Sequence, residues 1–201
     1  MGEKSAQKKQ YIREVARRVF MEKGFKDVTM KDIVEACHIS RGGLYLYYSG
    51  TQEIFLDVLK METQETDDVF AGALSRSATA ADILELFLCE QKKELLRQDQ
   101  TLAVATYEYA FLANRQEGEN YLGARFQEAQ RIIEQLIQLG VRNGEFVCSD
   151  PKGAAGNIML ALEGLKIAAR TMGVTEEAVD REIRYLLHGL SAGARGDSIS
   201  F

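Results

Sequence analysis

The 201-residue sequence has no tryptophan, only one proline and only two histidines. Its three cysteines, Cys37, Cys89 and Cys148, are far apart and odd in number, so we expect neither a disulfide framework nor a zinc site. No apolar run approaches the ~20 residues that a membrane-spanning helix needs. The basic start also lacks the apolar core of a secretory signal. We therefore expect a cytoplasmic protein with no metal, no cofactor and no membrane partner.

Hydrophobic residues make up 46% of the sequence and charged residues 27%, which is typical of a globular protein. Apolar residues recur at helical spacing along almost the whole chain, and no segment alternates like a strand. We predict an all-α fold of about nine helices. The predicted segments are 5–23, 30–36, 40–48, 51–72, 79–98, 101–114, 120–143, 151–173 and 175–190.

The change in helix length suggests two domains. Short helices fill residues 1–50, and longer helices fill residues 73–201. The helix over 51–72 links these two domains. The charge divides at the same place. Residues 1–50 hold ten basic and six acidic side chains, whereas the remainder holds fifteen basic and twenty-four acidic ones. A basic head on an acidic body is expected where only the head meets phosphates.

Residues 29–48 have the pattern of a helix-turn-helix, two short helices joined by a tight turn. Thr29 is a suitable N-cap, with Asp32 at the capping-box position. His38 lies in the bend, and histidine is among the non-glycine residues that are enriched at positive φ. Ser40 is a suitable N-cap for the second helix.

The second helix carries the residue types that contact with DNA requires. Gly42 and Gly43 allow the backbone to approach phosphates, and Ser40 can donate to one. Arg41 can bond a guanine edge or a phosphate. We predict Tyr45 and Tyr47 at a phosphate or a thymine methyl group. Leu44 and Tyr48 share a helix face, which predicts that Tyr48 mainly packs in the core.

Residues from about Tyr11 to Leu59 resemble the DNA-binding domain of the tetracycline-repressor (TetR) family of bacterial transcription regulators. The matching residues, in order, are Phe20, Gly24, Phe25, Thr29, Ile33, Ala36, Ile39, Ser40, Gly42, Leu44, Tyr45, Tyr47, Glu53 and Phe55. The resemblance implies that Thr29 and Lys31 open a helix lying across the DNA backbone, and that Arg41, Gly42, Gly43, Tyr45 and Tyr47 read the groove or touch phosphates.

The sequence departs from the family pattern at two positions. Thr51 stands where the family often has a phosphate-contacting lysine, and Gly50 replaces the usual capping serine. We therefore expect DNA affinity to depend more on Lys8, Lys9 and Lys31.

The resemblance further implies a homodimer joined by the last two long helices, a palindromic DNA operator, and a small-molecule effector bound among the middle helices. No motif names the effector. The candidate lining residues are Phe87, Cys89, Tyr107, Tyr109, Phe111, Tyr121, Phe126, Met159 and Glu163, and for each of them core packing is the competing interpretation. Glu108 and Glu163 are carboxylates on apolar helices, so each needs a partner if it is buried.

A ligand-responsive regulator, most often a repressor, is the function that this resemblance implies. An effector-independent architectural DNA-binding dimer is the main alternative. A helical enzyme is a third hypothesis, but the sequence offers no nucleophile–base pair, phosphate loop or metal spacing for it.

Overall fold

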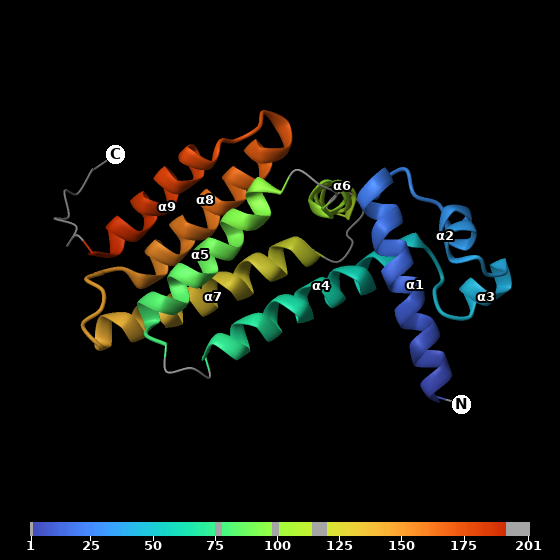
Figure 1. Ribbon diagram of the computed structural model, residues 1–201, viewed down its shortest axis with the longest axis horizontal. Helices are drawn as coiled ribbons and strands as arrows, with labels where there is room; N and C mark the ends of the chain where they lie inside the picture. The colour runs from blue at the N-terminus through green and yellow to red at the C-terminus, as the bar shows by residue number, and fades with distance from the viewer. Residues whose placement is uncertain (1, 75–77, 98–100, 114–119, 192–201) are drawn as a thin grey trace. The chain divides into compact units, whose positions relative to one another are not determined.

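The computed structural model describes residues 2–74, 78–97, 101–113 and 120–191, and these residues form nine helices and no strand (Figure 1). The all-α prediction is confirmed. The helices are α1 (Gly2–Lys23), α2 (Met30–Cys37), α3 (Arg41–Tyr45), α4 (Thr51–Leu74), α5 (Ala80–Leu96), α6 (Ala103–Ala113), α7 (Tyr121–Arg142), α8 (Pro151–Thr171) and α9 (Glu176–Ser191).

The predicted helix starts agree with the observed caps. Thr29 and Thr79 each accept from the amide three residues on and form capping boxes, and Asp150 caps α8 with Pro151 at its first position. The predicted third helix was too long. Regular α3 ends at Tyr45, because the Tyr47 amide bonds the Leu44 carbonyl in a tighter turn.

The chain forms two compact units. Unit 1 contains Met1–Val69 and Gln98–Leu122, and unit 2 contains Phe70–Arg97 and Gly123–Phe201. The structure thus groups α6 with the basic head, whereas the sequence suggested a division near residue 72. The physical reason is burial, since Leu102, Ala105 and Tyr109 belong to the head's hydrophobic core. The predicted functional division into a DNA-binding and a ligand-binding domain stays a prediction.

The core of unit 1 is centred on aromatic rings. The Phe20 and Phe55 rings meet edge to face with centroids 4.8 Å apart, and Phe25 lies 5.0 Å from Phe55. Tyr109 from α6 meets Phe25 edge to face at 5.1 Å. Aromatic pairs in such geometries each contribute about 0.5–1.5 kcal/mol beyond the burial of their area. The short helices α2 and α3 therefore pack against a closely packed aromatic core.

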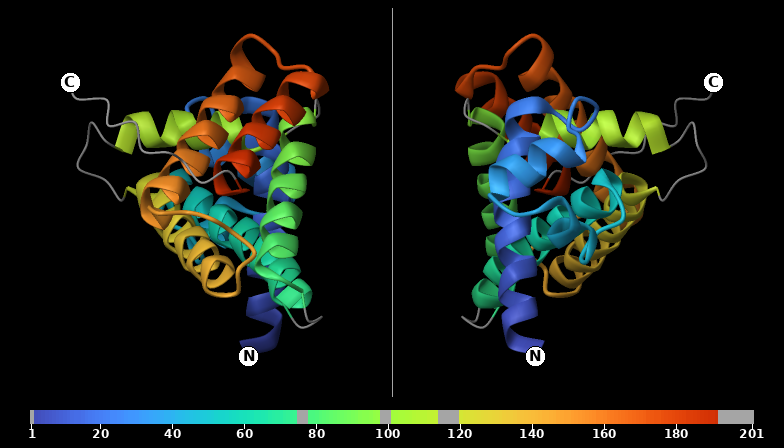
Figure 2. Two further views of the ribbon diagram at one scale, coloured as in Figure 1. Left: turned by 90° about the vertical axis from the view of Figure 1, so that its left-hand side faces the viewer. Right: turned by 90° about the vertical axis from the view of Figure 1, so that its right-hand side faces the viewer.

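In unit 2, α5, α8 and α9 lie side by side (Figure 2). Ile133 and Ile137 of α7 complete its hydrophobic core. No helix among the described residues is long and apolar enough to cross a membrane. The segment between the predicted helices 101–114 and 120–143 lies outside the described residues, as do residues 192–201.

Candidate nucleic-acid interface

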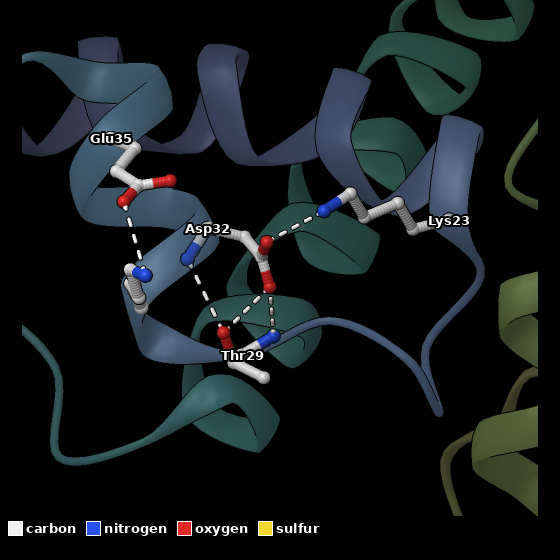
Figure 3. Close-up of polar contacts among 5 residues, drawn as sticks. Lys23, Thr29, Asp32 and Glu35 are labelled. Atoms are coloured by element: carbon white, nitrogen blue, oxygen red, sulfur yellow. Dashed lines mark hydrogen bonds and ion pairs between the residues drawn. The ribbon is translucent and has the colours of Figure 1, made fainter.

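The start of α2 is fixed by a compact group of polar contacts (Figure 3). The Thr29 amide donates to Asp32 Oδ2 at 2.8 Å, and the Asp32 amide donates to Thr29 Oγ1 at 3.3 Å. The Lys23 ammonium, at the end of α1, lies 2.6 Å from Asp32 Oδ1. This Lys23 bond, followed by the bonds from the Thr29 hydroxyl and amide, holds the pKa of Asp32 well below its ordinary value. The ionised Asp32 thus ties α1 to the first turn of α2.

The turn between α2 and α3 has the predicted left-handed residue. His38 adopts φ 52° and ψ 42°, and it is the only described non-glycine residue with positive φ. The His38 amide donates to the Glu35 carbonyl and the Ile39 amide to the Val34 carbonyl. These bonds close the end of α2 and set the angle at which α3 begins.

The first turn of α3 is open toward solvent. Ser40 Oγ accepts from the Gly43 amide at 3.1 Å, as its predicted capping role requires. A Cβ atom at Gly42 would meet nothing within 4 Å, so the backbone there is bare on its outer side. Such an uncovered helix start can approach a phosphate closely, and its free amides can donate to it.

The outer face of α3 combines one cation with apolar surface. The Arg41 guanidinium lies over the Tyr45 ring, 5.7 Å from its centroid. Tyr45 is 44% exposed, and the adjacent Leu46 is 83% exposed. Tyr47, in contrast, is half-buried and packs against the core. Helical spacing turned Leu46 away from the core, but the sequence prediction did not include it among the DNA contacts, because a leucine carries no polar group that would mark it as one.

Tyr48 is buried, as predicted, and anchors α3 to the rest of unit 1. Its hydroxyl donates to Asp57 Oδ2 of α4 at 2.6 Å. Burial, and then this bond to Asp57, raises the pKa of Tyr48 far above its ordinary range. Burial opposes ionisation of Asp57, but the bond from Tyr48 and the charges of Lys9 and Arg13 leave the pKa of Asp57 below its ordinary value.

This anchor changes the expected role of Lys9. Its ammonium lies 3.1 Å from Asp57 Oδ2 and over the Tyr48 ring, so it is held inside unit 1. Lys8 lies over the Tyr11 ring. Lys31 is 82% exposed on its side chain and is paired only loosely with Glu35, at 3.6 Å. Of these three lysines, Lys31 is the one best placed to reach a phosphate.

The start of α4 accounts for the departure at Gly50. Glu53 Oε2 accepts from the Ser49 amide at 2.7 Å and from the Ser49 hydroxyl at 2.9 Å. The backbone bond from Ser49, and then the hydroxyl bond, lower the pKa of Glu53. Ser49 and Glu53 thus stabilise this helix start without a serine at position 50.

Eight of the residues predicted to line an effector site divide equally between the two units. Tyr107, Tyr109, Phe111 and Tyr121 lie in unit 1. Tyr109 is a core residue, and the Tyr121 hydroxyl lies 2.8 Å from Thr63 Oγ1 and donates to the Leu59 carbonyl at 3.0 Å. Phe111 is exposed. Tyr109 and Tyr121 thus already have structural contacts within unit 1.

The other four residues, Phe87, Phe126, Met159 and Glu163, lie in unit 2. Met159 is buried in its core, and Phe87 and Phe126 pack partly buried against that core. Glu163 Oε1 lies 3.0 Å from the Lys166 ammonium on the same helix, which supplies the partner that the sequence required. Cys89, the further candidate, is exposed. Among the described residues no group of His, Cys, Asp and Glu could hold a metal ion.

Two family models match the chain. Residues 12–58 match the family described as "Bacterial regulatory proteins, tetR family", and residues 83–180 match "Tetracyclin repressor-like, C-terminal domain". The chain is also 33% identical over 150 residues to an uncharacterized HTH-type transcriptional regulator, YfiR, of Bacillus subtilis (strain 168). That match covers 74% of this chain and 73% of the relative.

Solved structures of similar fold include two TetR-family regulators. One, from Haloarcula marismortui ATCC 43049, is 17% identical with a TM-score of 0.77 and covers 92% of this chain and 97% of its own. The other, from Agrobacterium tumefaciens, is 15% identical with a TM-score of 0.75 and covers 93% and 99%. At these identities the likeness concerns the fold alone.

Proposed function

The chain belongs to the tetR family of bacterial regulatory proteins, and from this premise we propose that it is a ligand-responsive repressor that binds a palindromic operator as a homodimer. In this proposal a small-molecule effector releases the repressor from DNA. Members of the family are transcription factors and not enzymes, so no catalytic step is part of the function.

The observation that carries the proposal is the outer face of α3. Only Leu44 of its five residues is buried, while Arg41, Gly42 and Tyr45 face solvent. A helix that presents its side chains outward, fixed from behind by Leu44 and Tyr48, is the arrangement by which a recognition helix enters the major groove.

Each predicted DNA contact has a role in this proposal. Arg41 bonds a guanine edge or a phosphate, and Tyr45 meets a phosphate or a thymine methyl group. The uncapped amides at the start of α3, beside the bare backbone of Gly42, receive a phosphate. Thr29 and Lys31 place the start of α2 on the sugar-phosphate backbone. Tyr47 is half-buried and packs against the core, so only part of its side chain can reach DNA.

The dimer is supported by the exposed face of α8. Leu160 and Ile167 are 66% and 48% exposed, and Gly164 lies between them on the same helix face. Tyr185 of α9 is an exposed aromatic side chain. A subunit that packs this face against a second copy would remove these apolar side chains from water. It would also generate the twofold symmetry that a palindromic operator reflects.

The proposed effector site is drawn from the predicted aromatic and acidic side chains of both units. Phe87, Phe126, Met159 and Glu163 in unit 2 and Tyr107, Tyr109, Phe111 and Tyr121 in unit 1 are the side chains that we propose near it. Their chemistry, largely aromatic with one carboxylate, suits a mostly apolar molecule that carries a hydroxyl or cationic group.

The decisive experiment measures binding of the purified protein to DNA upstream of its own gene by fluorescence anisotropy at several salt concentrations. We expect a specific complex with nanomolar Kd, about 10³-fold or more tighter than on scrambled DNA, and a steep loss of affinity with salt. Equal affinity for operator and scrambled duplex would exclude an operator-specific repressor.

A thermal-shift screen distinguishes a ligand-responsive repressor from an effector-independent architectural DNA binder. A compound that binds the native state raises the apparent Tm, and an effector must also dissociate the DNA complex. An architectural DNA binder would keep its DNA in the presence of every compound that stabilises it.

A further inference from the structure

The connection between α1 and α2 contains a backbone site for an anion. Gly24 ends α1 in the left-handed region, with φ 79°. The two amides that follow, those of Phe25 and Lys26, point at a single oxygen atom. Consecutive backbone amides next to a left-handed residue form a concave site of positive potential, called a nest, which binds anionic groups.

The anion in this nest is the carboxylate of Glu108 from α6. Its Oε2 accepts from the Phe25 amide at 2.7 Å and from the Lys26 amide at 3.1 Å. These contacts join residues more than eighty positions apart in sequence. Bonds from amides to a charged acceptor are about twice as strong as those between neutral groups.

Gly24 is required by this contact as well as by its backbone angle. A Cβ atom at position 24 would lie only 2.5 Å from Glu108 Oε2, so any side chain there would displace the carboxylate. The ring of the neighbouring Tyr109 packs against the rings of both Phe25 and Phe55, and this packing fixes α6 beside the nest. Glu108 is thus held at the nest by α6, a helix that is itself packed into the core of unit 1.

The nest lies next to the start of α2, which we propose to contact DNA. The segment that holds it ends at Thr29, the cap of α2, and Lys23 at the end of α1 reaches Asp32 in the first turn of α2. Any movement of this segment therefore shifts the start of α2. Glu108 itself lies within the region that matches the C-terminal family model, residues 83–180.

We propose that Glu108 is a positioning residue for DNA binding: by filling the Gly24 nest it holds the α1–α2 connection, and with it α2 and α3, in the geometry that binds the operator. This inference rests on the proposed function. Without the carboxylate, the connection must be ordered when DNA binds, and ordering costs affinity.

The sign of the effect separates positioning from simple electrostatics. Glu108 is an acidic residue in a unit that meets phosphates, so through charge alone its removal would strengthen DNA binding. Positioning predicts the opposite. Because Glu108 makes no proposed phosphate contact, its loss should also leave the slope of log Kd against log salt concentration unchanged.

The test compares full-length E108A, E108Q and a control on the same helix, V104A, whose side chain is exposed. Operator Kd is measured well below the Tm of each variant, and hydrogen exchange of the Phe25 and Lys26 amides is followed by NMR without DNA. We expect E108A to weaken operator binding about tenfold and to speed exchange at both amides. E108Q, whose amide oxygen can still accept, should weaken binding only about threefold, and V104A should match the wild type.

Faster exchange in E108A with a Kd within about twofold of the wild type would show a contact that does not position the head, and would overturn the proposal. Unchanged exchange would overturn it as well, because the contact would then not protect the nest. If E108A does not fold, E108Q decides by the same two criteria. If the wild type itself binds no operator while E108A still exchanges faster, the proposed function fails, and the positioning role falls with it although the nest contact stands.

Discussion

Two of the surfaces that expose apolar side chains differ in what surrounds those side chains. On unit 1, Tyr45 and Leu46 lie beside Arg41 and an open glycine backbone. On α8, Leu160 and Ile167 are the large exposed side chains, and the partly buried charges of Glu163 and Lys166 are paired with each other. Both surfaces leave apolar area in water, which soluble proteins do mainly where a partner binds.

The difference shows which partner each surface fits. A cation beside aromatic and aliphatic groups suits the edge of a DNA groove, where phosphates alternate with bases and methyl groups. A helix face with a glycine between two large apolar side chains suits close contact with another helix, because the centres of protein interfaces are more apolar than the rest of the surface. The exposed apolar area alone would not distinguish the two.

The largest effect is expected from placing unpaired charge on the exposed face of α8. The double variant Leu160→Glu, Ile167→Glu should be monomeric at micromolar concentration, since two carboxylates per subunit would be buried without partners. Operator affinity should fall more than about 100-fold, because a single head loses half of the contacts. Analytical ultracentrifugation and anisotropy measure the two results.

The matched control for this variant is Ile132→Glu on α7, where the isoleucine is also exposed. It should leave both the mass in solution and the operator Kd unchanged. A double variant that stays dimeric would show that α8 does not form the interface.

Removing the cation from the other surface should give the next largest effect. Arg41→Ala should weaken operator binding about 10- to 100-fold, corresponding to the loss of one good base or phosphate contact. The dimer should persist. Arg142→Ala, an exposed arginine in the last turn of α7, serves as the control for loss of one positive charge. Equal effects of the two substitutions would show that Arg41 contributes only through its positive charge and makes no specific contact with DNA.

A smaller effect concerns stability and its dependence on pH. The pKa of Asp32 is lowered in the folded state, so the unfolded state binds the proton more readily. Its contribution is therefore present above the unfolded pKa of about 4 and is lost as the pH falls below it. Asp32→Asn should cost about 1 kcal/mol at pH 7 and progressively less towards pH 2.

Urea unfolding at pH 7 and at pH 3 measures this difference, with Asp27→Asn as the control for an exposed aspartate. A loss of stability that is the same at both pH values would contradict a contribution from the ionised carboxylate.

The smallest effect is expected at Leu46. Because the side chain is 83% exposed, Leu46→Ala should change the free energy of unfolding by less than about 0.5 kcal/mol. It should weaken operator binding about threefold if Leu46 touches a thymine methyl group. Replacing individual thymines by uracil should then weaken wild-type binding at one position and leave the variant unaffected there. If no thymine position shows this difference between the wild type and the variant, Leu46 does not enter the groove.

Much of the fold could be predicted from local chemistry. Thr29, Asp150 and Pro151 marked helix starts, and Gly24 marked a helix end, because capping depends on residues only three or four positions apart. His38 could be placed in the left-handed region for the same reason. The buried position of Tyr48 followed from its helical spacing with Leu44.

What could not be predicted depends on contacts between distant residues. Nothing local to Lys9 shows that Asp57 holds it, and nothing local to Glu108 shows that its partners are two amides more than eighty positions away. The inclusion of Tyr109 in the head core has the same origin. Leu46 was left out of the predicted contacts although helical spacing turned it outward, because an apolar side chain carries no local sign of a DNA contact.

The brevity of α3 has a consequence for how this protein can change. A single buried leucine holds the five-residue helix from within, while its outward residues contribute little to the free energy of unfolding. Mutations at those outward positions can therefore alter the preferred DNA sequence without a matching loss of folded protein. After gene duplication, a copy could drift to a new target through single substitutions, each of which leaves a viable intermediate.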